Sequence, residues 1–94
     1  MKLLKIINSK NKNKRYTAIF LVNGKIKKTS FGSSKYENYL IHRDKTRRDR
    51  YRARHNHDNI SNPLSAGALS WYILWGDSTS LNKNIQDFKN KFNL

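Results

Sequence analysis

The segment Arg43–His57 constrains the fold most, because it cannot contribute to a hydrophobic core. It holds six Arg and one Lys against two Asp, and Tyr51 is its only sizeable apolar side chain. No Gly or Pro interrupts it, and the Asp44 carboxylate can accept from the first amides of a helix, so we predict a short basic helix at about 44–55. Such a helix offers almost no apolar stripe for tertiary packing.

Helical spacing divides the side chains of this segment between two faces. Arg47, Tyr51 and Arg54 fall on one face, and Lys45, Arg48 and Arg52 fall on another. Like charges at this density repel one another, so the segment is costly unless an anion lies beside it. The alternative is a solvated face that is held by Tyr51 and by local Asp–Arg pairs.

The N-terminal third predicts antiparallel strands. Lys2–Ile7 is a first strand, and the polar stretch 8–15 is a loop that either follows a phosphate backbone or is a solvated connection. Tyr16–Val22 is rich in β-branched and aromatic residues, which favour a strand. Asn23-Gly24 tolerates the two positive φ values of a type I′ turn, and Lys25–Phe31 is then the returning strand.

A two-residue turn fixes the register of this hairpin. It pairs Val22 with Lys25, Phe20 with Lys27, Ala18 with Thr29 and Tyr16 with Phe31. We expect the face that carries Tyr16, Phe20 and Phe31 to be buried, because it holds the larger aromatic area. The lysines of the returning strand form either a basic rim or a protection against pairing with another sheet; they are Lys25, Lys27 and Lys28.

The remaining apolar residues predict two further helices. Leu64–Leu74 follows Pro63 and is the most apolar run, and its small residues 65–68 would let another element approach closely. Apolar residues recur at helical spacing from Leu81 to Phe92, so an amphipathic helix at about 81–91 should pack against it. We expect Tyr36 and Tyr39 to be core or partly buried, with base stacking on these rings as the alternative. We expect Trp75 to be core, with a solvent-facing position in a binding surface as the alternative.

Together these elements predict an α+β fold. A small antiparallel hairpin or three-stranded sheet at about 2–31 is followed by about three helices, at about 44–55, 64–74 and 81–91. We expect one basic domain of residues 1–94. No run reaches membrane-spanning length, and the apolar start at Met1–Ile7 is too short for the core of a signal peptide.

The charge balance indicates the class of partner. The chain carries 20 Lys and Arg against six acids, a formal net charge of +14, which favours a polyanion such as DNA, RNA or an acidic surface. There is no Cys, the acids are scattered, and there is no nucleotide-binding or metalloprotease motif, so we expect neither an enzyme nor a cofactor. His42, His55 and His57 would bind a metal only if the fold brought them together.

Arginine is suited to phosphate because its planar guanidinium donates two parallel hydrogen bonds and stays charged. The seven cations of the basic segment would neutralise about 5–7 phosphates, with a log–log salt slope of roughly −5 to −6. The candidate nucleic-acid-binding residues are Arg43, Lys45, Arg47, Arg48, Arg50, Arg52, Arg54 and His55, with the hairpin residues Lys25, Lys27 and Lys28.

Several short motifs, taken in order between about Arg15 and Leu94, carry a family resemblance. They are Tyr16-Thr17-Ala18-Ile19-Phe20 with a Gly-Lys turn, Phe31-Gly32, Tyr39 through His42-Arg43-Asp44, Arg50-Tyr51 with Arg54-His55, Asn62-Pro63-Leu64-Ser65-Ala66-Gly67, and Leu74-Trp75. This pattern resembles small basic proteins of the nucleocytoplasmic large DNA viruses of algae and amoebae. A Pro commonly follows the Asp in that pattern, where this chain has Lys45.

The resemblance implies a viral setting, the virion or the viral factory in the host cytoplasm, and it supplies no catalytic residues. With the basic segment, it leads us to expect a DNA-binding protein that contacts the phosphate backbone, most simply in duplex DNA, and that serves in genome packaging. The alternative is a minor capsid or cement protein whose basic face meets an acidic capsid surface. Self-assembly of the chain is left open.

Overall fold

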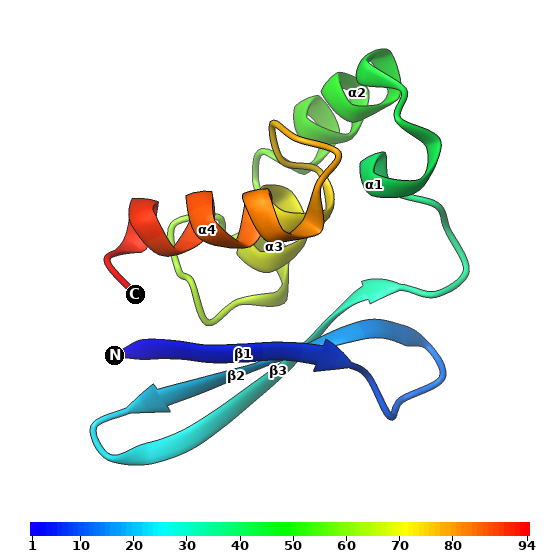
Figure 1. Cartoon of the computed structure of the whole chain (residues 1–94). Helices are drawn as coiled ribbons and strands as arrows, with labels where there is room; N and C mark the ends of the chain where they lie inside the picture. Colours follow the sequence, from blue (N-terminus) through cyan, green and yellow to red (C-terminus); the bar gives the residue numbers. More distant parts are fainter.

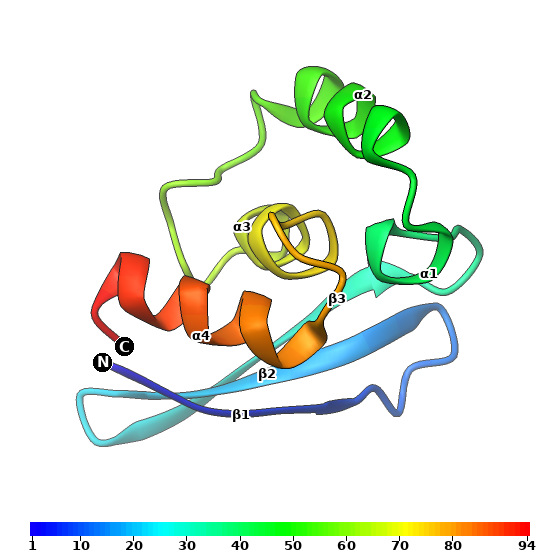
Figure 2. The same ribbon diagram turned by 45° about the horizontal axis from the view of Figure 1, so that its top comes forward.

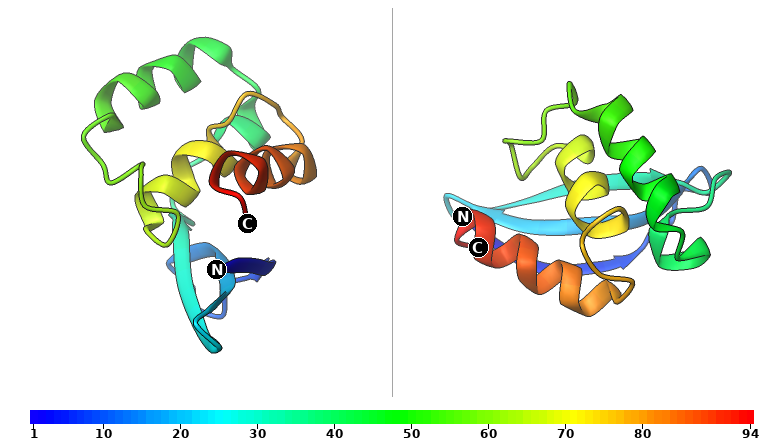
Figure 3. Two further views of the ribbon diagram at one scale, coloured as in Figure 1. Left: turned by 90° about the vertical axis from the view of Figure 1, so that its left-hand side faces the viewer. Right: turned by 90° about the horizontal axis from the view of Figure 1, so that it is seen from above.

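The computed structural model describes residues 1–94 as a sheet covered on one face by helices (Figures 1 and 3). The strands are antiparallel and adjacent in chain order: β1 (Lys2–Asn8), β2 (Lys14–Val22) and β3 (Lys25–Ser33). The helical elements are α1 (Tyr39–His42), α2 (Lys45–His55), α3 (Ala66–Leu69), the π-helical η1 (Ser70–Leu74) and α4 (Leu81–Phe92). The predicted α+β class is confirmed.

The β2–β3 hairpin has the predicted turn and register. Asn23 has φ 51° and Gly24 has φ 79°, as a type I′ turn requires. Val22 pairs with Lys25 and Tyr16 pairs with Phe31. The polar connection from β1 is shorter than the predicted 8–15 loop, because β2 begins at Lys14 rather than at Tyr16.

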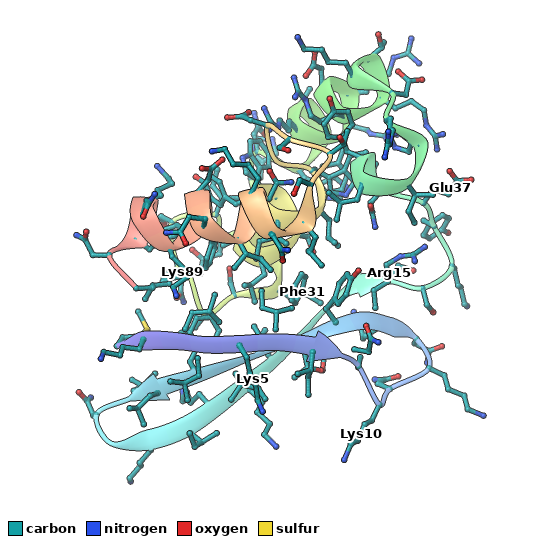
Figure 4. All side chains as sticks on the ribbon, in the orientation of Figure 1. Lys5, Lys10, Arg15, Phe31, Glu37 and Lys89 are labelled. Atoms are coloured by element: carbon teal, nitrogen blue, oxygen red, sulfur yellow. The ribbon has the colours of Figure 1, made fainter.

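The core lies between the sheet and the helices, on the predicted face. The rings of Phe20 and Phe31 are fully buried, and Figure 4 shows Phe31 pointing from the sheet toward the helices. The helices contribute Leu69, Ile73 and Phe88 to the same cluster. The outer face of the sheet has no helix over it (Figure 3), and Ile26 on that face is 54% exposed.

The predicted 64–74 helix begins at Ala66 and changes character at Ser70. The Ser65 hydroxyl caps it by accepting from the Ala68 amide. Its second half is π-helical, and the Trp75 amide donates to the Ser70 carbonyl across this wider turn. The expected close approach occurs at Gly67, where a Cβ would lie 3.0 Å from the Asp58 Cβ.

Helix α4 packs on η1 as predicted, and the Tyr72 ring lies against the rings of Phe88 and Phe92. A buried asparagine joins the two elements. The Asn84 amide nitrogen donates to the carbonyls of Ile73 and Ser78, and its oxygen accepts from the Ser78 amide. These bonds fix the Gly76–Ser80 turn and, with it, the end of η1.

The layers place α2 farthest from the sheet. Helices α3 and α4 lie directly over the sheet, and α2 lies beyond α3 (Figures 1 and 2). The most basic element is therefore the outermost layer, and most of its surface faces solvent.

Candidate nucleic-acid interface

Helix α2 begins where the sequence predicts. The Asp44 carboxylate accepts hydrogen bonds from the amides of Thr46 and Arg47. Lys45 is therefore the first helical residue, a position at which proline is well tolerated because its missing amide has no helical partner. The Lys45 that departs from the resembled pattern occupies this permissive position and leaves the helix start unchanged.

Aromatic stacking holds α2 against the rest of the protein. The Tyr51 ring lies between His55, with ring centroids 4.1 Å apart, and Trp75, also 4.1 Å away and inclined by only 4°. Burial raises the pKa of Tyr51 to about 12, the charge of Asp58 adds to the rise, and the Ser70 side chain opposes it. The phenol therefore stays neutral around neutral pH, and an uncharged ring stacks at no cost in charge desolvation.

Two arginines of α2 make contacts within the chain. Arg52 donates to the Trp75 carbonyl at 2.8 Å and to the Asp77 carboxylate at 2.9 Å. Arg48 is only 8% exposed; its guanidinium lies 5.0 Å from the Tyr39 ring centre and pairs with Asp49. Both were predicted as nucleic-acid contacts, and in the structure both link α2 to other parts of the protein.

Three other arginines of α2 line a cleft of about 670 Å³. Arg47, Arg50 and Arg54 form one wall, which is the predicted face with Arg50 added. The loop between β3 and α1 forms the opposite wall and includes Tyr36 and Glu37; Figure 4 shows Glu37 on this loop. None of the three guanidinium groups is paired with a carboxylate. The cleft therefore has one strongly cationic side.

The other candidate residues lie apart from this wall or make local contacts. Arg43 and Lys45 are exposed at the start of α2, and the His55 ring pairs with Asp58 at 2.9 Å. The hairpin lysines lie at the far end of the sheet from α2 (Figure 1), and Lys28 faces the opposite side of β3 from the other two. The fold does not bring Lys25, Lys27 and Lys28 together with the α2 cations.

The sequence-based prediction is wrong for Tyr36 and partly right for Trp75, which also packs against the core. Tyr36 was expected in or near the core and is 73% exposed, whereas Tyr39 is buried as predicted. Trp75 was expected in the core and is half-buried, forming part of the cleft wall. The polar neighbours of Tyr36, Lys35 and Glu37, were the available signal that this ring faces solvent.

His42 is held neutral by its surroundings. Its Nδ1 accepts from the Asp44 amide at 2.9 Å, and its Nε2 is buried without a partner. Desolvation and the nearby Arg47 charge lower the pKa of His42, against the opposing charges of Asp44 and Glu37. No three His, Asp or Glu side chains lie close enough together to hold a metal ion. No helix is both long and apolar enough to cross a bilayer.

The molecule is thus a small, strongly basic α+β protein. It belongs to DUF5754, a family of unknown function whose profile matches residues 4–55, more than half of the chain. The match covers nearly all of the sheet together with α1 and α2, and it ends at the last residue of α2. No curated protein and no solved structure matches the chain.

Removing the Tyr51 ring should release α2 while leaving the sheet intact. In Tyr51→Ala the stack on Trp75, which joins α2 to the rest of the protein, is lost together with the stack on His55 within the helix. The first alone is worth roughly 0.5–1.5 kcal/mol beyond area burial, so local opening should become at least about twofold more frequent. Amide hydrogen exchange should accelerate across Lys45–His55 and change far less in β2. Ala53→Ser, at an exposed site on the same helix, is the control. Equal acceleration in α2 and β2 would contradict this role for Tyr51.

The lowered pKa of His42 predicts a loss of stability in mild acid. The unfolded chain, with its His pKa near 6.5, binds a proton that the folded chain resists, so the His42 contribution is full above that pH and falls below it. Between about pH 7.5 and about pH 5.5, denaturant titration should show a larger fall in unfolding free energy for the wild type than for His42→Asn. The Asn side chain keeps an acceptor for the Asp44 amide. Parallel pH profiles for the two proteins would refute the prediction.

Proposed function

We propose that this protein binds nucleic acid, with duplex DNA as the principal partner, through contacts between phosphates and one side of α2. The observation that carries the proposal is the division of the α2 arginines. Arg48 and Arg52 have partners within the chain, whereas Arg47, Arg50 and Arg54 have no carboxylate partner and share one cleft wall. Crowded guanidinium groups repel one another, and phosphate relieves that repulsion.

The expected salt dependence of binding follows from the number of α2 cations that have no partner within the chain. Adding the exposed Arg43 and Lys45 gives five candidate cations, fewer than the seven of the basic segment, because two are used internally. Five phosphate contacts correspond to a log–log salt slope of roughly −4 to −5. Backbone contacts of this kind position a protein without reading sequence, which suits a packaging role.

A binding role is a better match to the cleft than a catalytic one. Guanidinium groups keep their charge at any relevant pH, so they bind phosphate but do not exchange protons with it. The resemblance to proteins of large DNA viruses supports a setting in the virion or the viral factory of the host cytoplasm. We propose genome packaging there as the biological role.

The outer face of the sheet supports a second candidate, a minor capsid or cement protein. Ile7 and Ile26 are exposed on this face, and Figure 4 shows Lys5 projecting from it away from the helices. Exposed apolar side chains interspersed with lysines are suited to an acidic protein surface.

Binding should depend on the cleft arginines more than on total charge. We expect labelled duplex DNA, measured by fluorescence anisotropy, to bind the wild type with the slope given above. A variant combining Arg47→Gln, Arg50→Gln and Arg54→Gln should weaken binding uniformly across sequences and reduce the slope by about 3. The matched control combines Lys25→Gln, Lys27→Gln and Lys28→Gln, which removes the same charge and should retain most of the affinity. Equal losses in both variants, or no binding at low salt, would refute the proposal.

The two candidate functions predict different positions in a virus particle. A genome-binding protein should separate with the nucleic acid when purified particles are stripped of their shell, whereas a cement protein should remain with the shell. Immunogold labelling of intact and opened particles measures this directly. Labelling on an ordered shell lattice would count against genome packaging.

A further inference from the structure

Among the aromatic rings that line the cleft, Tyr36 is the most exposed. Tyr51 is covered on one face by His55 and on the other by Trp75. The Trp75 ring has Tyr51 as one neighbour and His42, at 5.3 Å, as another. Tyr36 is 73% exposed and packs against no other ring. It therefore offers a planar ligand the most open aromatic surface of the cleft.

The backbone under Tyr36 is held in place, although its ring is exposed. Arg15, on β2, donates from Nε to the Ser33 carbonyl at 3.2 Å and from Nη2 to the Tyr36 carbonyl at 2.7 Å. Figure 4 shows Arg15 beside the end of β3 that leads into this loop. The Ser34 hydroxyl also donates to the Lys12 carbonyl. A ligand that stacks on Tyr36 therefore meets a loop that is already ordered, which lowers the entropic cost of binding.

The two walls of the cleft differ in chemistry. Arg47, Arg50 and Arg54 lie on the α2 wall, and Tyr36 lies on the loop wall beside Glu37, the one acid that lines the cleft. The Glu37 carboxylate repels phosphate from the loop wall, while the arginines attract it to the α2 wall. A ligand with an anionic end and a flat, uncharged end should therefore bind in one orientation, with its anionic end toward α2 and its flat end toward the loop.

From these observations, and resting on the proposed function, we propose that the cleft holds one unpaired nucleotide of a single strand. Its base stacks on the Tyr36 ring, and its flanking phosphates lie against Arg47, Arg50 and Arg54. The cleft volume of about 670 Å³ falls in the range of pockets that hold small ligands. Bases in a duplex are stacked and paired, so only a strand end, a gap or a single strand presents a base to the ring.

The test measures the binding of the full chain to a labelled ten-nucleotide single strand and to a duplex of the same length, by fluorescence anisotropy over a series of salt concentrations. Tyr36→Ala should weaken single-strand binding by about 5- to 150-fold, the range expected for loss of one base–aromatic stack, and leave duplex binding unchanged. Tyr36→Phe keeps the ring and should retain wild-type affinity. Strands of DNA and of RNA are compared, and dependence on Tyr36 with either one supports the inference.

Controls separate this inference from the proposed function. Ile41→Ala removes another exposed apolar side chain, outside the cleft, and should change neither affinity. If Tyr36→Ala binds single strands as the wild type does while duplex binding persists and depends on salt, the nucleotide site is overturned and the proposed function stands. If neither strand nor duplex binds the wild type, both are overturned.

Discussion

The stacking of Tyr51 on Trp75 determines where α2 lies, and the character of the cleft depends on that position. A helix normally docks by burying an apolar stripe, and α2 has only this one large ring to bury. The flat contact with Trp75 is supported by Arg52, which bonds to the carbonyl of the same tryptophan. One aromatic contact and a few polar bonds thus hold α2 in place, where an apolar stripe would normally do so.

This docking divides the arginines of α2 into two kinds. Arg48 lies against the Tyr39 ring and pairs with Asp49. Arg52 donates to the Trp75 carbonyl and to the Asp77 carboxylate. Because α2 is fixed by those contacts, Arg47, Arg50 and Arg54 face the β3–α1 loop. The like-charge repulsion among these three is not offset by the chain itself. That imbalance is the physical basis for our proposal that the protein has an anionic partner.

Local signals explain which features could be predicted from the sequence. The Asn23-Gly24 turn, the Asp44 cap and the apolar spacing of α4 each involve residues a few positions apart, and all three are confirmed. The roles of Arg48 and Arg52 could not be predicted in this way. Arg52 bonds to residues 23 and 25 positions away, which no periodicity indicates. Asn84 was missed for the same reason, since its partners belong to a different element.

The family match includes one part of the cleft and leaves out another. It includes every α2 arginine and Tyr36, but it ends before Trp75, the residue on which Tyr51 stacks. The shared segment therefore contains the groups that we propose contact a ligand, whereas Trp75, on which α2 docks, lies outside it.

The orientation of that docking surface depends on the π-helical winding of Ser70–Leu74. A π-turn holds one residue more than an α-turn, and in an α-helix each residue advances the direction of the side chains by roughly 100°. If the same residues were wound as a regular α-helix, the indole that follows them would be turned away from α2. Such a chain would keep its composition, its charge and its sheet, yet α2 would lose the Trp75 ring on which Tyr51 stacks.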